Sequence, residues 1–427
     1  MKSHHFLEEV ISCIRSKEAK EYVEIELKAH LNQTKKEWMK KGYKEDEAEE
    51  LAVRNMGSPF DIGRKMDRLH RPKIDWTLMS MYLFMSVSGL LLFWFFFKDG
   101  NSFSVLKQVY SVTGSIIVTF LLLFFDYRKL QKWGWVFFTI GCLILVQFPF
   151  SGLIINGQPQ INIFGLFSAD STIVLPLFLL AWAGMLQSKR MNVYLAAILY
   201  IGSVFLLMYS SNWTAFGLYS LMVAAMVWKS GLNKKKIIKT AFAMLAVCVS
   251  LLFIFRDGIK TYQLERLYGF LMPEKNSETS GYMYLKLERL VEGAGWFGHI
   301  HSLELADLYN EMMTDFIFVS ITYAFGWAGA IFAGLLFLWI IWRISRIFTT
   351  VIDPFGKMLI FGSFALFTAQ VTISIGMSLG VLPIVSVSLP FMSYGTLPVM
   401  INAFLFGLIL SVYRKKNIIR IKKIEAK

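Results

Sequence analysis

The sequence predicts an all-α, polytopic membrane protein with about ten transmembrane helices, a large extracytoplasmic loop and a small N-terminal cytoplasmic helical domain. The first observation is composition: the 427 residues are 55% hydrophobic, with a mean hydropathy of +0.50. The second is that no charged residue occurs from Met358 to Tyr413. Water-soluble domains do not leave so long a stretch uncharged, whereas a bilayer requires it, because a charge at the bilayer centre is costly.

Residues 1–72 are a separate, charged segment that we expect to form a cytoplasmic domain of amphipathic helices. Apolar residues in its first part recur at helical spacing and are expected to lie near one another: Tyr22, Ile25, Leu27 and Leu31. A further helix is expected from Asp46 to Met56, ended by Gly57. Ser58 and Pro59 then suit the cap and the first turn of the next helix. The run A-V-R-N-M-G-S-P-F-D-I-G resembles the permease prefix domain of some bacterial membrane proteins.

Ten apolar runs follow and predict the spans of a membrane domain, residues 73–416. They lie near residues 77–97, 108–125, 133–150, 172–187, 192–209, 213–228, 238–255, 315–343, 357–379 and 396–413. Basic residues gather in alternate loops and in the C-terminal tail, residues 417–427, so the positive-inside rule places both termini in the cytoplasm. The only long loop, residues 257–314, then lies outside the cytoplasm, and a long structured loop is usually functional.

Four short motifs stand in and after this loop. Y-Q-L-E-R-L-Y-G-F-L-M-P begins at Tyr262, and E-G-A-G-W-F-G begins at Glu292. M-T-D-F-I-F begins at Met313 and opens the eighth predicted span, and L-P-F-M-S-Y-G begins at Leu389. In this order the motifs resemble the SEDS family of bacterial cell-wall membrane proteins, known as FtsW, RodA and SpoVE, over roughly residues 75–415.

The resemblance implies a peptidoglycan glycosyltransferase in the bacterial plasma membrane. Members of that family polymerise lipid II at the outer membrane face during cell division, elongation or sporulation, together with a class B penicillin-binding protein. The implied partners are therefore lipid II or another undecaprenyl-linked precursor, the penicillin-binding protein and the lipid bilayer. The family's key acid is the Asp of T-D-F-I-F, which is Asp315 in this sequence.

Asp315 is the predicted catalytic residue. Polymerisation joins a sugar hydroxyl to an anomeric carbon whose leaving group is a lipid pyrophosphate. A carboxylate at the outer interface can accept the hydroxyl proton as general base, or help to hold a divalent cation against the pyrophosphate, and the sequence leaves both readings open. The structural alternative is that Thr314 and Asp315 open a helix, where hydroxyls cap and carboxylates favour the helix dipole.

Acidic and basic residues of the outer loop are further candidates for substrate binding. Asp307 and Glu311 precede Asp315 by eight and four residues, a spacing that stacks all three on one face if the helix begins early. Lys286 and Arg289 match phosphate oxygens. The alternatives are a solvated acidic edge for the first pair and an amphipathic loop helix for the second.

Polar residues near the last span are the other candidates. Pro390 and Gly395 break the helical pattern, and irregular backbone at membrane depth survives only where protein or a water-filled cavity covers it. We therefore expect Ser393 and Tyr394 to line a cavity that binds substrate. Asn402 matches a polar position of the family, although it would also serve as a hydrogen bond between helices.

The resemblance fails at several polar positions. The family's Q-P-S-E before the fourth span is Asp170 to Ile173 here, a Lys in that span is Pro176, and P-D-x-G near the sixth span is Ser210 to Trp213. A cavity that loses charged groups loses proton acceptors and phosphate partners. The alternative function is therefore a non-catalytic SEDS-like protein that binds or flips a lipid-linked precursor or scaffolds a wall-synthesis complex.

Two other function classes are disfavoured by the distribution of charge and metal ligands. The net charge of +14 comes from Lys and Arg in short loops between apolar runs, so no nucleic-acid partner is predicted. His299 and His301, with Glu304 nearby, are too few for a metal site, and none is predicted. The three cysteines have no metal or redox spacing.

Overall fold

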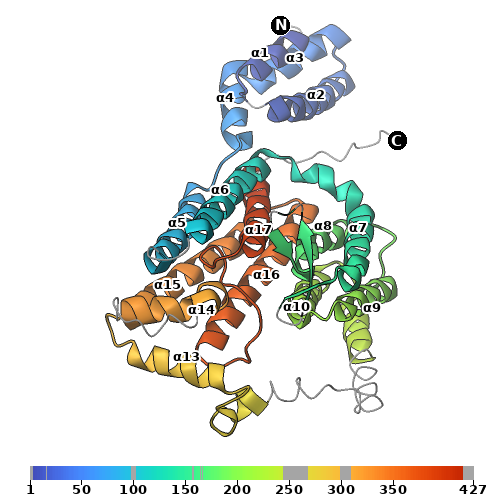
Figure 1. Cartoon of the computed structure of the whole chain (residues 1–427). Coiled ribbons are helices and arrows are strands. Elements are labelled where there is room, and N and C mark those ends of the chain that lie inside the picture. Colours follow the sequence, from blue (N-terminus) through green and yellow to red (C-terminus); the bar gives the residue numbers. More distant parts are fainter. Residues whose placement is uncertain are drawn as a thin grey trace. The chain divides into compact units, whose positions relative to one another are not determined.

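A computed structural model describes residues 3–15, 17–97, 102–155, 158–163, 165, 167–243, 268–298 and 309–416. The chain falls into two compact units (Figure 1). One consists of Met1–Asp75, Thr350–Asp353 and the chain from Val412 onward, and the other of Trp76–Thr349 and Pro354–Ser411. Three predicted segments lie wholly or partly outside the described residues: the span at 238–255, the loop at 257–314 and the tail at 417–427.

The N-terminal part of the smaller unit is a set of short helices. They are α1 (Ser3–Ser12), α2 (Lys17–Lys40), α3 (Glu45–Met56) and α4 (Pro59–His70). The α2 residues Val23, Leu27 and Leu31 are four apart, so they lie on one face, where they join a buried apolar cluster with Phe6 of α1. The predicted apolar face was wrong at Ile25, whose side chain is 56% exposed because two positions along a helix turn it away from Val23 and Leu27.

The junction of α3 and α4 follows the local sequence. Gly57 ends α3 with φ at +86°, a left-handed backbone conformation that glycine adopts without steric cost. Pro59 opens α4 in its first turn, where the missing backbone N–H needs no partner. Ser58 holds the position before α4, as predicted, but its side chain makes no capping hydrogen bond.

Glu49 ties α3 to the two helices before it. Its Oε1 accepts hydrogen bonds from the Ser3 hydroxyl at 2.6 Å and from the Ser3 backbone N–H at 3.0 Å. Its Oε2 accepts one from Lys35 Nζ at 3.3 Å. These donors, the Ser3 hydroxyl first, lower the pKa of Glu49 to about 2. The charged carboxylate therefore stabilises the start of α1.

We expect Glu49→Gln to weaken α1 without unfolding the bundle. Losing hydrogen bonds to a charged group costs about 1.5–3 kcal/mol, so amide hydrogen exchange in α1 should be roughly 10-fold faster or more than in wild type at neutral pH. Because the folded pKa is depressed, the carboxylate's contribution is present above the unfolded pKa of about 4.5 and is lost as pH falls toward about 2. The difference between the two proteins should vanish over that window. A difference that persists at the lowest pH would contradict this account.

The larger unit is built from apolar helices. In chain order they are α5 (Trp76–Phe97), α6 (Ser102–Phe124), η1 (Tyr127–Trp133), α7 (Gly134–Gln147), η2 (Phe148–Phe150), η3 (Ser171–Val174), α8 (Leu175–Met185), α9 (Val193–Tyr209), α10 (Trp213–Lys229), η5 (Glu274–Asn276), α13 (Tyr282–Gly293), α14 (Tyr309–Thr314), α15 (Ile317–Thr350), α16 (Pro354–Ser378) and α17 (Thr396–Lys415). Among the described helices, six are long and apolar enough to cross a membrane. The stretches Ser171–Met185 and Val193–Tyr209 are shorter apolar helices. These helices lie over the runs predicted from the sequence.

A small sheet departs from the all-α prediction. Its strands β1 (Leu153–Ile155), β2 (Gln158–Ile163) and β3 (Phe167–Ala169) form antiparallel pairs in the order β1-β2-β3 (Figure 1). The strands are only three to six residues long, and Pro159 stands within β2. Such short, interrupted strands leave little periodicity for a sequence pattern to reveal. The sheet connects η2 to η3 and so stands just before α8.

The long helix α15 contains a break at Gly326, which lies against the E-G-A-G-W-F-G motif. Gly326 has φ at +70° inside the helix, and an added Cβ there would lie 2.3 Å from the backbone of Trp296. The backbone N–H groups of Trp327 and Ala328 donate to the carbonyls of Gly295 and Trp296 at 3.0 and 3.2 Å. The E-G-A-G-W-F-G motif therefore supplies acceptors to donors that the break has freed, and only glycine fits at position 326.

Candidate active site

Asp315 lies in the two-residue break between α14 and α15. The carbonyl of Phe316 accepts the first hydrogen bonds of α15, from Val319 N at 2.9 Å and Ser320 N at 3.2 Å. The prediction that Thr314 and Asp315 open the helix is therefore wrong: the helix begins at Ile317, and Asp315 precedes its cap. For the same reason α14 and α15 do not form one continuous helix, so the predicted face through Glu311 and Asp315 is interrupted.

The break is fixed to the segment that precedes α17. Tyr394 N donates to Met313 O at 2.8 Å, and Ser320 Oγ donates to Met312 O at 2.9 Å. The first bond joins Leu389–Gly395 directly to the end of α14. Two motifs that are about eighty residues apart in the sequence, T-D-F-I-F and L-P-F-M-S-Y-G, are thereby placed side by side.

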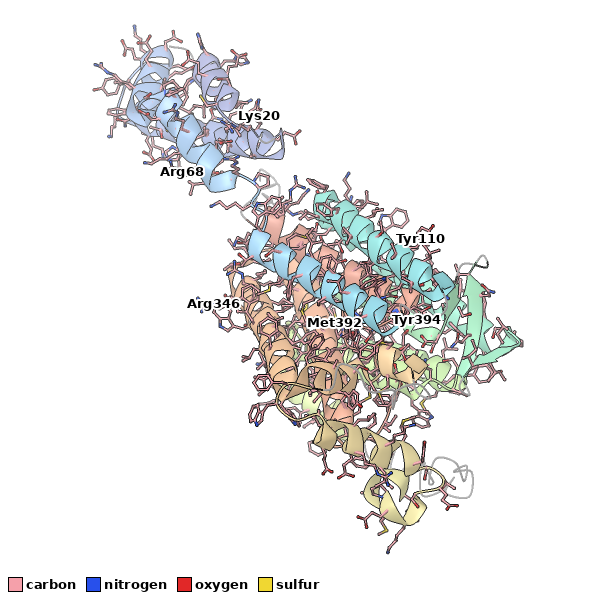
Figure 2. All side chains as sticks on the ribbon, turned by 60° about the vertical axis from the view of Figure 1, so that its left-hand side comes forward. Lys20, Arg68, Tyr110, Arg346, Met392 and Tyr394 are labelled. Carbon is pink, nitrogen blue, oxygen red and sulfur yellow. The ribbon has the colours of Figure 1, made fainter. Side chains whose placement is uncertain are left out.

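Helices α5 and α6 hold the same segment from another side. Gln108 of α6 reaches it twice, with Nε2 donating to Ser393 O at 3.4 Å and Oε1 accepting from Gly395 N at 3.3 Å. The ring of Tyr394 stacks on Phe93 of α5 with centroids 4.6 Å apart. Figure 2 shows Met392 and Tyr394 within this part of the larger unit. These contacts satisfy irregular backbone at membrane depth, as a lipid environment requires.

A polar cavity of about 420 Å³ lies where these elements meet. Its charged lining residues are Asp315, Asp170 before η3, and Lys107 from α6. Of the described residues that line it, Lys107 is the only basic one. Neutral polar residues complete much of the wall: Gln160, Ser168, Thr172, Thr214, Thr314, Gln370, Ser386, Ser388, Tyr394, Thr396 and Asn402. Such a lining can bind a ligand that carries both hydroxyl groups and negative charge.

Asp170 is held by the start of η3. Its Oδ1 accepts the backbone N–H of Thr172 at 2.8 Å and also the Thr172 hydroxyl. Burial raises the pKa of the Asp170 carboxyl, and the Thr172 donors only partly oppose that effect. Asp170 therefore takes up a proton more readily than an exposed aspartate does.

Asn402 brings an unsatisfied acceptor to the cavity wall. Its side chain is 3% exposed, and Nδ2 donates to Pro398 O at 3.0 Å. Its Oδ1 is buried and has no hydrogen-bond partner among the described residues. Leaving a buried acceptor unpaired costs about 1–3 kcal/mol, so this oxygen favours a bound molecule that supplies an N–H or O–H donor.

The structure brings together three of the predicted site residues and separates the others. Asp315, Tyr394 and Asn402 line the cavity. Ser393, next to Tyr394, is 1% exposed and does not line it. Glu311 lies in α14, where only its backbone is described, and Asp307 lies outside the described residues, as do His299, His301 and Glu304.

Lys286 and Arg289 stand on α13, away from the cavity lining. Leu287 and Leu290 of that helix pack into an apolar cluster with Met312 and Phe316. Lys286 Nζ instead donates to Tyr282 OH at 3.3 Å, and Arg289 is exposed. This is the amphipathic helix that the sequence offered as the alternative for these two residues. Among the described side chains, no group of three or more His, Cys, Asp or Glu could hold a metal ion.

Sequence reasoning missed Lys107, Asp170 and Gln370. The sequence did hold a signal for Lys107. Helix α6 carries Gln108, Ser111, Ser115 and Thr119 at helical spacing in an apolar span, and the structure buries all four. Such a stripe marks the side of a transmembrane helix that faces protein rather than lipid. Asp170 gave no such signal, because its distance from Asp315 in the sequence hides that the two residues line one cavity.

Taken together, the apolar helices and the polar cavity define a multi-pass membrane protein with a polar cavity among its helices. The chain belongs to the FtsW/RodA/SpoVE family, because the family model described as cell cycle protein matches residues 72–418. Stage V sporulation protein E of Bacillus subtilis (strain 168) is 25% identical over 361 residues, covering 80% of this chain and 97% of that protein. A probable peptidoglycan glycosyltransferase FtsW of Thioalkalivibrio sulfidiphilus (strain HL-EbGR7) is 28% identical over 298 residues, covering 65% and 72%.

Solved structures share the fold. A chain from a structure described as structural coordination of polymerization and crosslinking by a peptidoglycan synthase complex superposes with a TM-score of 0.68 at 20% identity, covering 80% of this chain and 98% of that one. The rod shape determining protein RodA of Thermus thermophilus superposes with a TM-score of 0.59 at 19% identity, covering 80% and 97%. The membrane unit described above is therefore the fold of this family.

Proposed function

We propose that this protein is a peptidoglycan glycosyltransferase that polymerises lipid II at the outer membrane face during cell division, elongation or sporulation. The observation that carries the proposal is the cavity that Asp315 lines together with Lys107, Tyr394 and Asn402. The names of the relatives, a sporulation protein and a probable peptidoglycan glycosyltransferase, agree with that chemistry.

The reaction assigns a task to three residues of the cavity wall. The sugar hydroxyl of one substrate attacks the anomeric carbon of another, and the bond from that carbon to the pyrophosphate oxygen breaks. Asp315 accepts the hydroxyl proton as general base. The ammonium of Lys107 faces the negative charge that gathers on the departing lipid pyrophosphate. The unpaired Oδ1 of Asn402 accepts a hydrogen bond from the sugar and orients it.

The second candidate is a non-catalytic protein that binds or flips a lipid-linked precursor or scaffolds a wall-synthesis complex. It is favoured by Pro176, which stands where the family has a lysine, and by the absence of the family's P-D-x-G at Ser210–Trp213. Purified protein incubated with labelled lipid II separates the two functions. Glycan chains resolved on a gel support the enzyme, whereas bound lipid II without chains supports the second candidate.

We also propose the domain boundaries and the orientation of the chain in the membrane. We assign residues 1–72 to a cytoplasmic regulatory domain, residues 73–416 to ten spans, and residues 417–427 to a basic cytoplasmic tail. The loop at residues 257–314 then lies on the outer side, where a class B penicillin-binding protein has access to it. Alternate basic loops support this orientation through the positive-inside rule.

Cysteine labelling tests the orientation. In a variant without the native cysteines, we expect Ser277→Cys to react with a membrane-impermeant maleimide in intact cells, because Ser277 is exposed and follows the seventh predicted span. Lys422→Cys should react only after the cells are permeabilised. The reverse pattern would contradict both the orientation and the placement of Asp315 near the outer face.

A further inference from the structure

One face of α4 points away from the apolar cluster of the N-terminal helices. Ile62 and Met66 pack on the apolar cluster of the N-terminal helices, and Gly63 approaches α1 so closely that an added Cβ would lie 2.6 Å from Cys13 Cβ. The opposite side therefore faces outward. Its residues Phe60, Arg64 and Arg68 follow one another at intervals of four and form one exposed stripe.

This outward face is basic and partly apolar. Phe60, its exposed apolar residue, is 52% exposed. The exposed basic residues on it and just beyond it are Arg64, Lys65, Arg68, Arg71 and Lys73. Asp61 is the exposed acid among them. Arg64 lies over the Phe60 ring, 4.3 Å from its centroid, so a guanidinium and an aromatic ring are presented together. A cluster of basic residues next to a membrane-spanning helix is the pattern of a segment that binds anionic lipid headgroups.

The chain keeps this face near a bilayer. Only Arg71–Asp75 separate the end of α4 from α5, the first apolar helix long enough to cross a membrane. Five extended residues span at most about 17 Å. Arg68 and Leu69 are therefore tethered close to the point where the chain enters the membrane, and the attraction between basic residues and anionic lipids acts over about a Debye length, roughly 8–10 Å.

We propose that the outward face of α4 (Phe60, Arg64, Lys65 and Arg68) docks on anionic lipid headgroups of the membrane that α5 enters. Arg64, Lys65 and Arg68 contact phosphate groups, and the Phe60 ring packs among the headgroups beside them. Docking fixes the N-terminal helices against the bilayer and makes their position depend on lipid charge. This inference is independent of whether the cavity polymerises lipid II.

Fluorescence of the full-length chain in nanodiscs tests the docking. A cysteine-free variant carries an environment-sensitive NBD dye at Phe60→Cys, and the matched control carries it at Ile25→Cys, a similarly exposed apolar position on α2. Nanodiscs contain phosphatidylcholine alone or mixed with phosphatidylglycerol, each with doxyl-labelled lipid as quencher. We expect a blue shift and quenching at position 60 in the phosphatidylglycerol nanodiscs, little at position 60 in phosphatidylcholine, and none at position 25.

A charge variant checks that the basic residues cause the docking. Arg64→Gln with Arg68→Gln keeps good helix formers and removes two cations, so the ratio of docked to undocked protein should fall by about fivefold for each lost charge. Equal quenching in both kinds of nanodisc would overturn recognition of lipid charge. A dye at position 60 that stays in water in phosphatidylglycerol nanodiscs would overturn the docking itself and leave the face to a protein partner.

Discussion

Asp315→Asn is expected to reduce lipid II polymerisation by about 10²–10⁴-fold, the usual contribution of a positioned general base. Asn keeps nearly the same volume and hydrogen-bonding capacity but cannot accept the hydroxyl proton. The variant should fold, because Asn has nearly the same shape as Asp, and its side-chain oxygen can still accept hydrogen bonds near a helix start. The measurement is the rate of glycan-chain formation from labelled lipid II by purified protein.

The matched control is Glu274→Gln, which removes an exposed carboxylate from the same predicted side of the membrane without touching the cavity. It should polymerise like wild type. Binding of lipid II by Asp315→Asn should persist, since the acid acts on the attacking hydroxyl rather than on the anionic leaving group. Equal rates for Asp315→Asn and wild type would exclude Asp315 as the base. An inactive wild type that still binds lipid II would favour the non-catalytic candidate.

Local signals in the sequence predicted the helices well. Gly57 and Pro59 fixed the boundary between α3 and α4, because left-handed backbone and a missing N–H are decided by one residue each. The uncharged stretch from Met358 covers most of α16 and α17, since lipid excludes charge wherever the helices pack. Ile25 was misplaced because apolar spacing alone does not say which of two nearby residues meets the core.

The site was predicted only in part because long-range contacts build it. Asp315, Tyr394 and Asn402 came from motifs, and all three line one cavity. Lys107 reaches that cavity because Gln108 and Ser111 bond residues almost three hundred positions away, including Ser111 Oγ to Thr396 Oγ1 at 2.8 Å. No periodicity within α6 specifies that partner. Lys286, by contrast, looked like a phosphate ligand from its charge alone.

The comparison of Lys107 with Lys286 is therefore a direct test of the cavity. Lys107→Met keeps an unbranched side chain of similar reach and removes the charge that faces the leaving group. Losing one partner of a buried charged pair costs about 2–5 kcal/mol, so lipid II polymerisation should fall by roughly 30-fold or more. Lys107→Arg retains the cation and should keep most of the activity. Lys286→Met, on an exposed face of α13, should have little effect.

Lipid II binding by the Lys107 and Asp315 variants separates electrostatic binding from general-base catalysis. If Lys107 holds the pyrophosphate, Lys107→Met should weaken lipid II binding itself, in a filter or fluorescence assay, whereas Asp315→Asn should not. A large loss in Lys286→Met with none in Lys107→Met would move the phosphate site to α13 and remove the cavity from the mechanism. The expected order follows from the fold: the α13 apolar face is buried against Met312 and Phe316, which turns Lys286 outward, while the hydrogen bonds of α6 keep Lys107 at the cavity wall.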